Sequence, residues 1–350
     1  MPTTLITRTR AAVAVLTPGY FALVMASGIL STGTHLQGHR SLSVILLGIC
    51  VTSFVTLLVL NGWRLLAYRR AMAEDFVRPD RAFGFFTFVA GTNVLGVRLG
   101  LDGHHQATAW LLVAAGAAWL VLGYVVPWTA VLGPQTRPVV ATANGTWFIW
   151  VVASQSIAVA AADLEPVVGA GRNALGLVAV MSWSIGIFLY VAAGVFVSLR
   201  LMNYPFGPED FTPPYWVAMG AVAITVVAGA NITDMADAPM VAATRGLVSG
   251  LSVVFWAFAT WLFPVLVAAG VWRHGIRKVP LRYEATLWSI VFPLGMYAVA
   301  GISLGRADHL PIVAEVGRVE LWVALAAFAL TLVAMVVHVT RTVLAPAPAS

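Results

Sequence analysis

One pattern recurs five times along this chain of 350 residues, and each occurrence opens an apolar segment. An aromatic residue stands five positions before an alanine or a proline, in a stretch rich in Gly, Ala, Ser and Thr. The five pairs are Phe21 with Ala26, Phe85 with Ala90, Phe148 with Ala153, Trp216 with Ala221, and Trp288 with Pro293. By subtraction, the aromatic residues lie 64, 63, 68 and 72 positions apart. Since each interval holds a second apolar segment, the repeat predicts helix pairs arranged around a common axis.

The composition places these helix pairs in a membrane. Hydrophobic residues make up 60% of the chain and charged residues only 10%, whereas soluble domains carry about 25% charged residues. Because a helix needs about 20 apolar residues to cross a bilayer, we predict ten spans, at 14–34, 41–62, 82–100, 107–132, 144–162, 174–199, 214–233, 246–271, 286–304 and 319–340. The loops are short, so we expect a single transmembrane domain over 1–344 and a disordered tail over 345–350.

Basic residues are distributed unequally between the two sides of the predicted membrane domain. Of the 20 Lys and Arg residues, 14 lie on the side that carries both termini and 6 on the other side. The positive-inside rule therefore places both termini in the cytoplasm, with the chain in the cell membrane. The net charge of +6 follows from this topology and does not indicate a nucleic-acid partner. The basic segment 63–81 is expected to be a cytoplasmic loop at the surface of anionic lipid.

The spans are of two kinds that alternate along the chain. The even-numbered spans are rich in Leu, Val and Trp, which suits contact with lipid. The odd-numbered spans are rich in Gly, Ala, Ser and Thr, which let helices approach closely and can face water within a bundle. We therefore expect an all-α fold of five helical hairpins in a quasi-fivefold array, with the odd-numbered helices lining a central pore. The alternative is that the odd-numbered spans are simply packed interhelical faces.

Charged and metal-binding residues give little support to other classes of function. The middles of the odd-numbered spans carry no charge. Snorkelling or a loop position would explain the charged residues at their outer ends, which are Arg98, Asp234, Asp237 and Arg306. The absence of a buried carboxylate argues against tightly coupled transport, and a neutral pathway fits passive permeation. The histidines are scattered and Cys50 is the only cysteine, so we expect no catalytic residue, no metal and no cofactor.

When the five repeats are aligned, the residues directly before the alanine or proline occupy equivalent positions. These are Met25, Val89, Val152, Gly220 and Phe292, and Phe292 is the largest. The following Pro293 removes a backbone donor and can kink the helix. An aromatic ring on a kinked inner helix would close a narrow pore, although a core aromatic beside a packing kink is the alternative. The first four aligned residues are therefore candidates for the pore lining, together with Gly28, Thr92, Gln155 and Gly295.

The stretch WSIVFPLGMYAVAG at 288–301 resembles the ninth helix of the tellurite-resistance/dicarboxylate transporter family. That family includes bacterial TehA proteins, the slow anion channels of plant guard cells, and fungal malate and sulfite transporters. A looser similarity covers PPYWVAMGAVAI at 213–224. The resemblance implies ten spans in five hairpins, a homotrimer, and a pore-blocking phenylalanine at Phe292.

Three functions are compatible with this pattern. The first is an anion channel, in which small inorganic or organic anions cross the bilayer through the central pore. The second is a secondary transporter or exporter of sulfite, a C4-dicarboxylate such as malate, or a tellurite-type oxyanion. The third is a membrane-embedded structural or sensory subunit, which would move no anion and would copurify with a partner.

Overall fold

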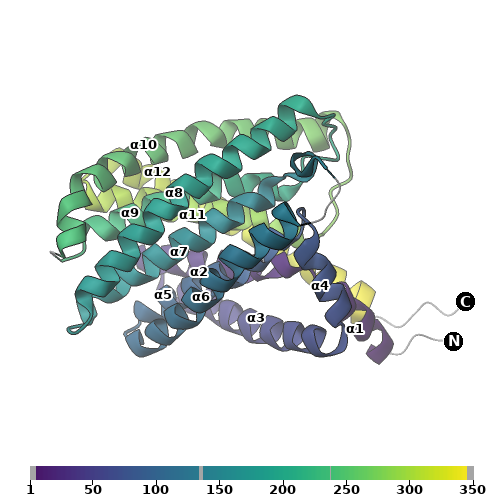
Figure 1. Ribbon diagram of the computed structural model, residues 1–350, viewed down its shortest axis with the longest axis horizontal. Helices are drawn as coiled ribbons and strands as arrows, with labels where there is room; N and C mark the ends of the chain where they lie inside the picture. Colours follow the sequence, from purple (N-terminus) through teal and green to yellow (C-terminus); the bar gives the residue numbers. More distant parts are fainter. Residues whose placement is uncertain (1–4, 134–136, 237, 345–350) are drawn as a thin grey trace, which may run out of the picture.

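The computed structural model describes residues 5–133, 137–236 and 238–344, and every regular element in these ranges is a helix. The predicted tail, 345–350, and Asp237 lie outside the described residues. The inner helices are α2 (Ala22–Leu36), α5 (Phe86–Gly100), α7 (Phe148–Leu164), α9 (Val217–Thr233) and α11 (Trp288–Ala307). Each pairs with the next long helix along the chain, in turn α3 (Arg40–Ala67), α6 (His105–Val126), α8 (Arg172–Asn203), α10 (Pro239–Gly270) and α12 (Pro311–Val339) (Figure 1).

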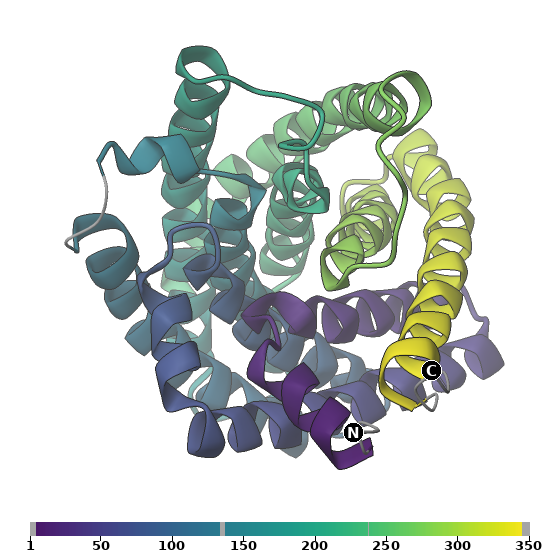
Figure 2. The same cartoon turned by 90° about the vertical axis from the view of Figure 1, so that its right-hand side faces the viewer.

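The inner helices close into a ring. Each one contacts the next inner helix along the chain, and α11 contacts α2 to complete the circle. Seen from the end of the bundle that carries the termini, the outer helices surround this ring, and the start of α1 (Leu5–Ala14) lies near the end of α12 (Figure 2). The predicted array of five hairpins with the odd-numbered spans inside is therefore confirmed.

Burial separates the inner helices from the outer ones. In the spans that contain α5, α7, α9 and α11, between 78% and 89% of the most apolar stretch is buried. In the outer spans the corresponding share is between 11% and 33%. Large apolar side chains such as Trp110, Phe188 and Trp261 are exposed on the outer helices. A surface of this kind is stable only against lipid or another apolar partner.

A short 3₁₀ turn opens every inner helix at the aromatic residue of the repeat. The five turns are η1 (Pro18–Phe21), η2 (Ala82–Phe85), η5 (Gly145–Trp147), η7 (Pro213–Trp216) and η9 (Ala285–Leu287). Each turn contacts the next, and η9 contacts η1. The aromatic residue of each repeat either ends its turn or follows it directly. The repeated aromatic therefore marks the level at which all five inner helices begin, and the inner helices run parallel to one another.

The first predicted span is broken in the structure. Within the described residues, nine helices are long and apolar enough to cross a membrane, and the bent pair of Leu5–Ala14 and Pro18–Leu36 makes a tenth. The two parts of that pair meet at 96°. Pro18 restricts the residue before it to an extended conformation, and Thr17 has φ −75° and ψ 138°. The predicted helix over 14–34 therefore begins only at Pro18, and α1 turns aside to contact α3.

The basic segment 63–81 is a folded element rather than the expected surface loop. It contains the end of α3 and the helix α4 (Arg69–Val77). Nη2 of Arg64 lies 2.7 Å from the Asp75 carboxylate, and Nη1 of Arg81 lies 2.8 Å from the other oxygen of that carboxylate. The side chains of Arg64 and Asp75 are each only 2% exposed. Arg64 also donates to the Ala14 carbonyl oxygen, so this cluster joins α1, α3 and α4.

Candidate functional site

A cavity of about 140 Å³ lies inside the ring of inner helices. All five inner helices contribute residues to its wall. On each helix these residues mostly recur every three or four positions, so they share one face of the helix. The lining residues are Ile29, Thr32 and Leu36 of α2; Asn93, Val94, Val97 and Leu101 of α5 and its end; Ser156, Val159 and Asp163 of α7; Ile224, Val227 and Asn231 of α9; and Met296, Val299 and Ser303 of α11. A cavity of this volume has room for several water molecules.

The cavity runs from a buried floor to a partly exposed mouth. The floor residues, one from each inner helix, are Ile29, Asn93, Ser156, Ile224 and Met296, and all are buried. The mouth residues Leu36, Leu101, Asp163, Asn231 and Ser303 are partly exposed. Since the mouth residues lie near the C-terminal ends of the inner helices, the cavity opens at the end of the bundle opposite the 3₁₀ turns.

The five aligned residues of the repeat lie directly below the floor. Met25, Val89, Val152, Gly220 and Phe292 each precede a floor residue by four positions. Residues four positions apart share one face of a helix, so the five side-chain positions point toward the axis one turn below the cavity. All five are buried, and Phe292, at 1% exposed, is the largest. The cavity therefore ends above this level.

Pro293 lies inside α11, which continues without a break to Ala307. Proline supplies no N–H, so the carbonyl of Ser289, four residues earlier, lacks its helical donor. The proline ring faces α9, where a Cβ atom added at Gly220 would lie 2.9 Å from Cγ of Pro293. The glycine therefore lets α9 pack closely against the residue that follows Phe292.

The remaining predicted lining residues contact helices rather than the cavity. A Cβ atom at Gly28 would lie 2.6 Å from Val94 of α5, and one at Gly295 would lie 3.0 Å from Ile29 of α2. Thr92 donates its hydroxyl hydrogen to the Phe88 carbonyl oxygen of its own helix at 2.7 Å. None of these three residues, nor any of the aligned residues below the floor, is among the residues that line the cavity.

Gln155 points away from the ring axis. Its Nε2 donates to the carbonyl oxygen of Trp183 on the outer helix α8, at 3.1 Å. The physical reason is the rotation of about 100° between consecutive helical residues. Because Ser156 faces the cavity, the preceding residue is directed toward α8.

The polar groups of the cavity wall are mostly neutral. Nδ2 of Asn93 donates to Oγ of Ser156 at 2.9 Å, and that hydroxyl donates to the Ala153 carbonyl oxygen at 2.7 Å. Oδ1 of Asn93 is buried and has no protein partner. A buried polar atom at a cavity of this size requires water or a ligand. The cavity therefore offers hydrogen-bonding groups to a partly dehydrated small solute.

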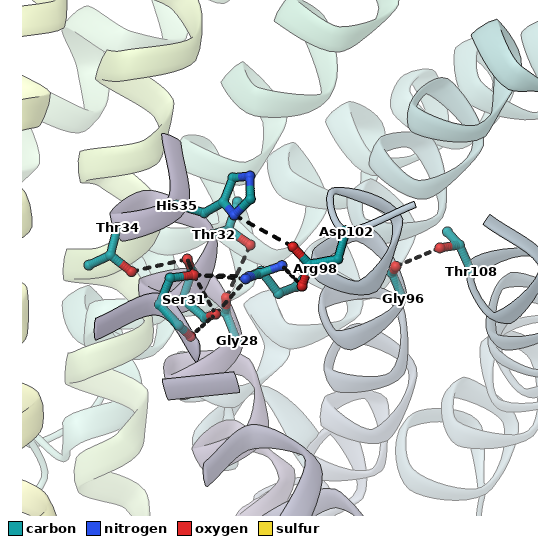
Figure 3. Close-up of polar contacts among 10 residues, drawn as sticks. Gly28, Ser31, Thr32, Thr34, His35, Gly96, Arg98, Asp102 and Thr108 are labelled. Carbon is teal, nitrogen blue, oxygen red and sulfur yellow. Dashed lines mark hydrogen bonds and ion pairs between the residues drawn. The ribbon is translucent and has the colours of Figure 1, made fainter. Parts of the chain in front are cut away.

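Arg98 does not snorkel to the surface as its position in the sequence suggested. Its guanidinium is 1% exposed and donates to the hydroxyl oxygens of Ser31 (2.8 Å) and Ser43 (2.9 Å) (Figure 3). Nη1 lies 2.9 Å from the Asp102 carboxylate. Arg98 and Ser31 are each next in sequence to a residue that lines the cavity, Val97 and Thr32 respectively. The positive charge of Arg98 therefore lies immediately behind the cavity wall.

Asp163 is the charged residue of the cavity wall that sequence reasoning missed. The predicted span ended at 162, whereas α7 continues to Leu164. Its spacing of four from Val159 and seven from Ser156 places it on the cavity-lining face of α7. The predicted absence of charge holds for the middles of the inner helices, but the cavity mouth carries one carboxylate, so the pathway is not neutral throughout. The spacing from Ser156 was a signal present in the sequence, but only the ring shows that this face is the inner one.

Metal-binding side chains do not gather at the cavity. Across 5–133, 137–236 and 238–344, no three His, Cys, Asp or Glu side chains are placed so that they could hold a metal ion. The lining residues include one acid and no Lys or Arg. The site is thus a hydrogen-bonding cavity with one negative group at its mouth and one positive group behind its wall.

Comparison with known proteins gives matches over most of the chain. The family described as voltage-dependent anion channel matches residues 15–336. An uncharacterized membrane protein of Mycobacterium tuberculosis is 63% identical over 156 residues, which cover 45% of this chain and 79% of that protein. An uncharacterized transporter of Methanocaldococcus jannaschii is 24% identical over 324 residues, which cover 90% of this chain and 91% of that protein. A second uncharacterized transporter of the same organism is 23% identical over 322 residues, covering 90% and 92%.

Proposed function

The chain belongs to the voltage-dependent anion channel family, and we propose that it carries small anions through the centre of its inner ring, with Phe292 as the closed gate. The observation that carries this proposal is the cavity that all five inner helices line, with one buried phenylalanine directly below its floor. The cavity opens the axis of the ring from the mouth to the floor, and the five aligned residues are buried one turn below that floor.

Occlusion at Phe292 has a simple physical basis. An anion that leaves the cavity floor meets apolar side chains where it needs water or hydrogen-bond donors. A narrow apolar constriction excludes water and thereby raises the barrier to an ion. Movement of the Phe292 ring would open the path. The Ser289 carbonyl oxygen has no helical donor at Pro293, and this missing hydrogen bond would assist the movement.

Anion preference over cations is proposed to come from hydrogen-bond donors and one distant cation. Two donors remain for an anion, the second hydrogen on Nδ2 of Asn93 and the hydroxyl of Ser303. The hydroxyls of Thr32 and Ser156 already donate to carbonyl oxygens of their own helices. The Arg98 guanidinium behind the wall adds a positive field that Asp102 partly offsets. Fields of this kind act more strongly in a low-dielectric site than in water.

We place the protein in the cell membrane as a single transmembrane domain, with both termini in the cytoplasm and the cavity open to the outside. Charge asymmetry supports this topology, and the exposed apolar outer helices are compatible with a homotrimer.

Cys50 is fully buried, so introduced cysteines report topology cleanly. We expect an impermeant thiol reagent to label Gly169→Cys in intact cells and Glu209→Cys only after permeabilisation. Labelling in the reverse order would contradict this topology.

The second candidate function is secondary transport or export of sulfite, a C4-dicarboxylate such as malate, or a tellurite-type oxyanion. The observation that favours it is Asp163 at the cavity mouth, since proton-coupled carriers use carboxylates of this kind. It differs from a channel in that flux would saturate and would depend on a proton gradient.

Flux through purified protein in liposomes tests the proposed function. Chloride, nitrate, sulfite and malate are compared with and without a pH gradient, and protein-free liposomes serve as the control. We expect flux of small monovalent anions that runs down their own gradient. Saturable flux of malate or sulfite driven only by a pH gradient would replace the channel with the transporter, and flux of no anion at all would contradict both.

A further inference from the structure

The carboxylate of Asp163 stands at the cavity mouth without a hydrogen bond or an ion pair to any described residue. It lies against α5, since a Cβ atom added at Gly100 would be 2.8 Å from Oδ2 of Asp163. The same Cβ atom would be 3.1 Å from the hydroxyl of Thr108 on α6. A side chain larger than hydrogen at position 100 would therefore displace the carboxylate, and the glycine provides the space for it.

The charged groups on the elements around Asp163 are mostly engaged elsewhere. On α5, Arg98 is paired with Asp102, which also lies 3.8 Å from Nδ1 of His35 on α2. After α7, Glu165 is paired with Arg172 of α8 at 3.0 Å. On α9, the residue that shares the mouth is the neutral Asn231.

His105 at the start of α6 is the titratable group that acts electrostatically on Asp163. The imidazole does not come within ion-pair distance of the carboxylate, and its buried Nδ1 has no partner. No basic side chain among the described residues therefore forms an ion pair that would neutralise an ionised Asp163. This carboxylate faces the space that an anion must cross to reach Asn93 and Ser156.

We propose that Asp163 is a proton-binding residue that determines anion entry, so that a proton and a small anion occupy the cavity mouth together. This inference rests on the proposed function of the ring. An ionised carboxylate repels an anion in the cavity, and its protonation from the aqueous phase removes the repulsion. Because coupling between two ligands is reciprocal, an anion in the cavity in turn favours the protonated carboxyl. The substrate class is then a small monovalent anion that binds with one proton.

The test is anion flux in liposomes, measured from mildly acidic to mildly alkaline pH for the wild type and three variants. Asp163→Asn removes the charge, Asp163→Glu retains a titratable carboxyl, and Glu315→Gln removes an exposed carboxylate of α12 that does not line the cavity. We expect wild-type nitrate flux to rise as the pH falls. We expect Asp163→Asn flux to be nearly independent of pH, and to exceed the wild type at neutral pH by about tenfold or more.

The two control variants separate charge from structure. Asp163→Glu should keep a rise in flux toward acidic pH, and Glu315→Gln should follow the wild type. A folded Asp163→Asn protein with the wild-type pH profile would overturn the role of Asp163 and leave the pathway intact. If nitrate moves through neither the wild type nor Phe292→Ala at any pH, the proposed function itself has failed.

Discussion

Phe292→Ala is expected to raise nitrate or chloride flux through the reconstituted protein by about tenfold or more, since each 1.4 kcal/mol removed from a barrier multiplies a rate by about ten. Phe292 has the largest side chain of the five buried residues one turn below the cavity floor, and in the proposed pathway its removal leaves Met25, Val89 and Val152 around a wider opening. A wider constriction admits water, and an ion then crosses it with less dehydration. The measurement is the rate of anion efflux per protein in liposomes.

Phe328→Ala is the matched control for this gate variant. Phe328 is also buried, but it lies on the outer helix α12 and packs against Trp288 with ring centroids 5.5 Å apart. Both substitutions remove one buried aromatic ring and create a cavity of similar size. Equal flux from the two alanine variants would show that loosened packing, rather than the Phe292 ring, limits the pathway. Phe292→Leu should give an intermediate flux, and it keeps the test open if the alanine variant does not fold.

Asp75→Ala is expected to destabilise the protein by about 3–5 kcal/mol, because it leaves the buried Arg64 guanidinium without its partner. Arg64 is 2% exposed, and Nη2 lies 2.7 Å from the Asp75 carboxylate. The same substitution deprives Arg81 of its carboxylate. Loss of this cluster also loosens α1, which receives a hydrogen bond from Arg64 at the Ala14 carbonyl oxygen. The measurement is thermal unfolding of the purified protein in detergent.

The adjacent residue supplies the control for Asp75. Glu74 forms an ion pair with Arg70 on the same helix, and its side chain is 64% exposed. Exposed pairs contribute about 0–1 kcal/mol, so Glu74→Ala should leave the unfolding temperature nearly unchanged. If the two alanine variants unfold at the same temperature, the buried cluster does not stabilise the end of the bundle.

The arrangement of the helices could be predicted from the sequence because both the thickness of the bilayer and the fivefold repeat constrain that arrangement. The length of each apolar stretch had to match the bilayer, and the alternation of small with large apolar residues separated inner from outer spans. The repeated aromatic proved to mark a 3₁₀ turn at the start of each inner helix, from Phe21 to Trp288. The break at Pro18 could have been read from the proline itself, because proline disfavours a helical residue before it.

Individual side chains were harder to place because a helix turns by about 100° per residue. Gln155 and Ser156 are neighbours in the sequence, yet one donates to α8 and the other lines the cavity. Arg98 was assigned to the surface from its position near a span end, but hydroxyl groups on α2 and α3 hold it in the interior. Such contacts join residues 55 and 67 positions apart, and no local pattern reports them.

By itself, the sequence determined that the chain folds as paired membrane helices in a fivefold repeat, because hydropathy and residue size act on each helix separately. Only the tertiary structure decided which face of each inner helix points to the axis, and therefore that Asn93, Ser156 and Asp163 share one cavity. It also decided that Arg64 and Arg98 are buried among partners. The physical reason is that the burial and pairing of a side chain depend on residues of neighbouring helices. The ability of a helix to cross a bilayer depends only on its own length and hydrophobicity.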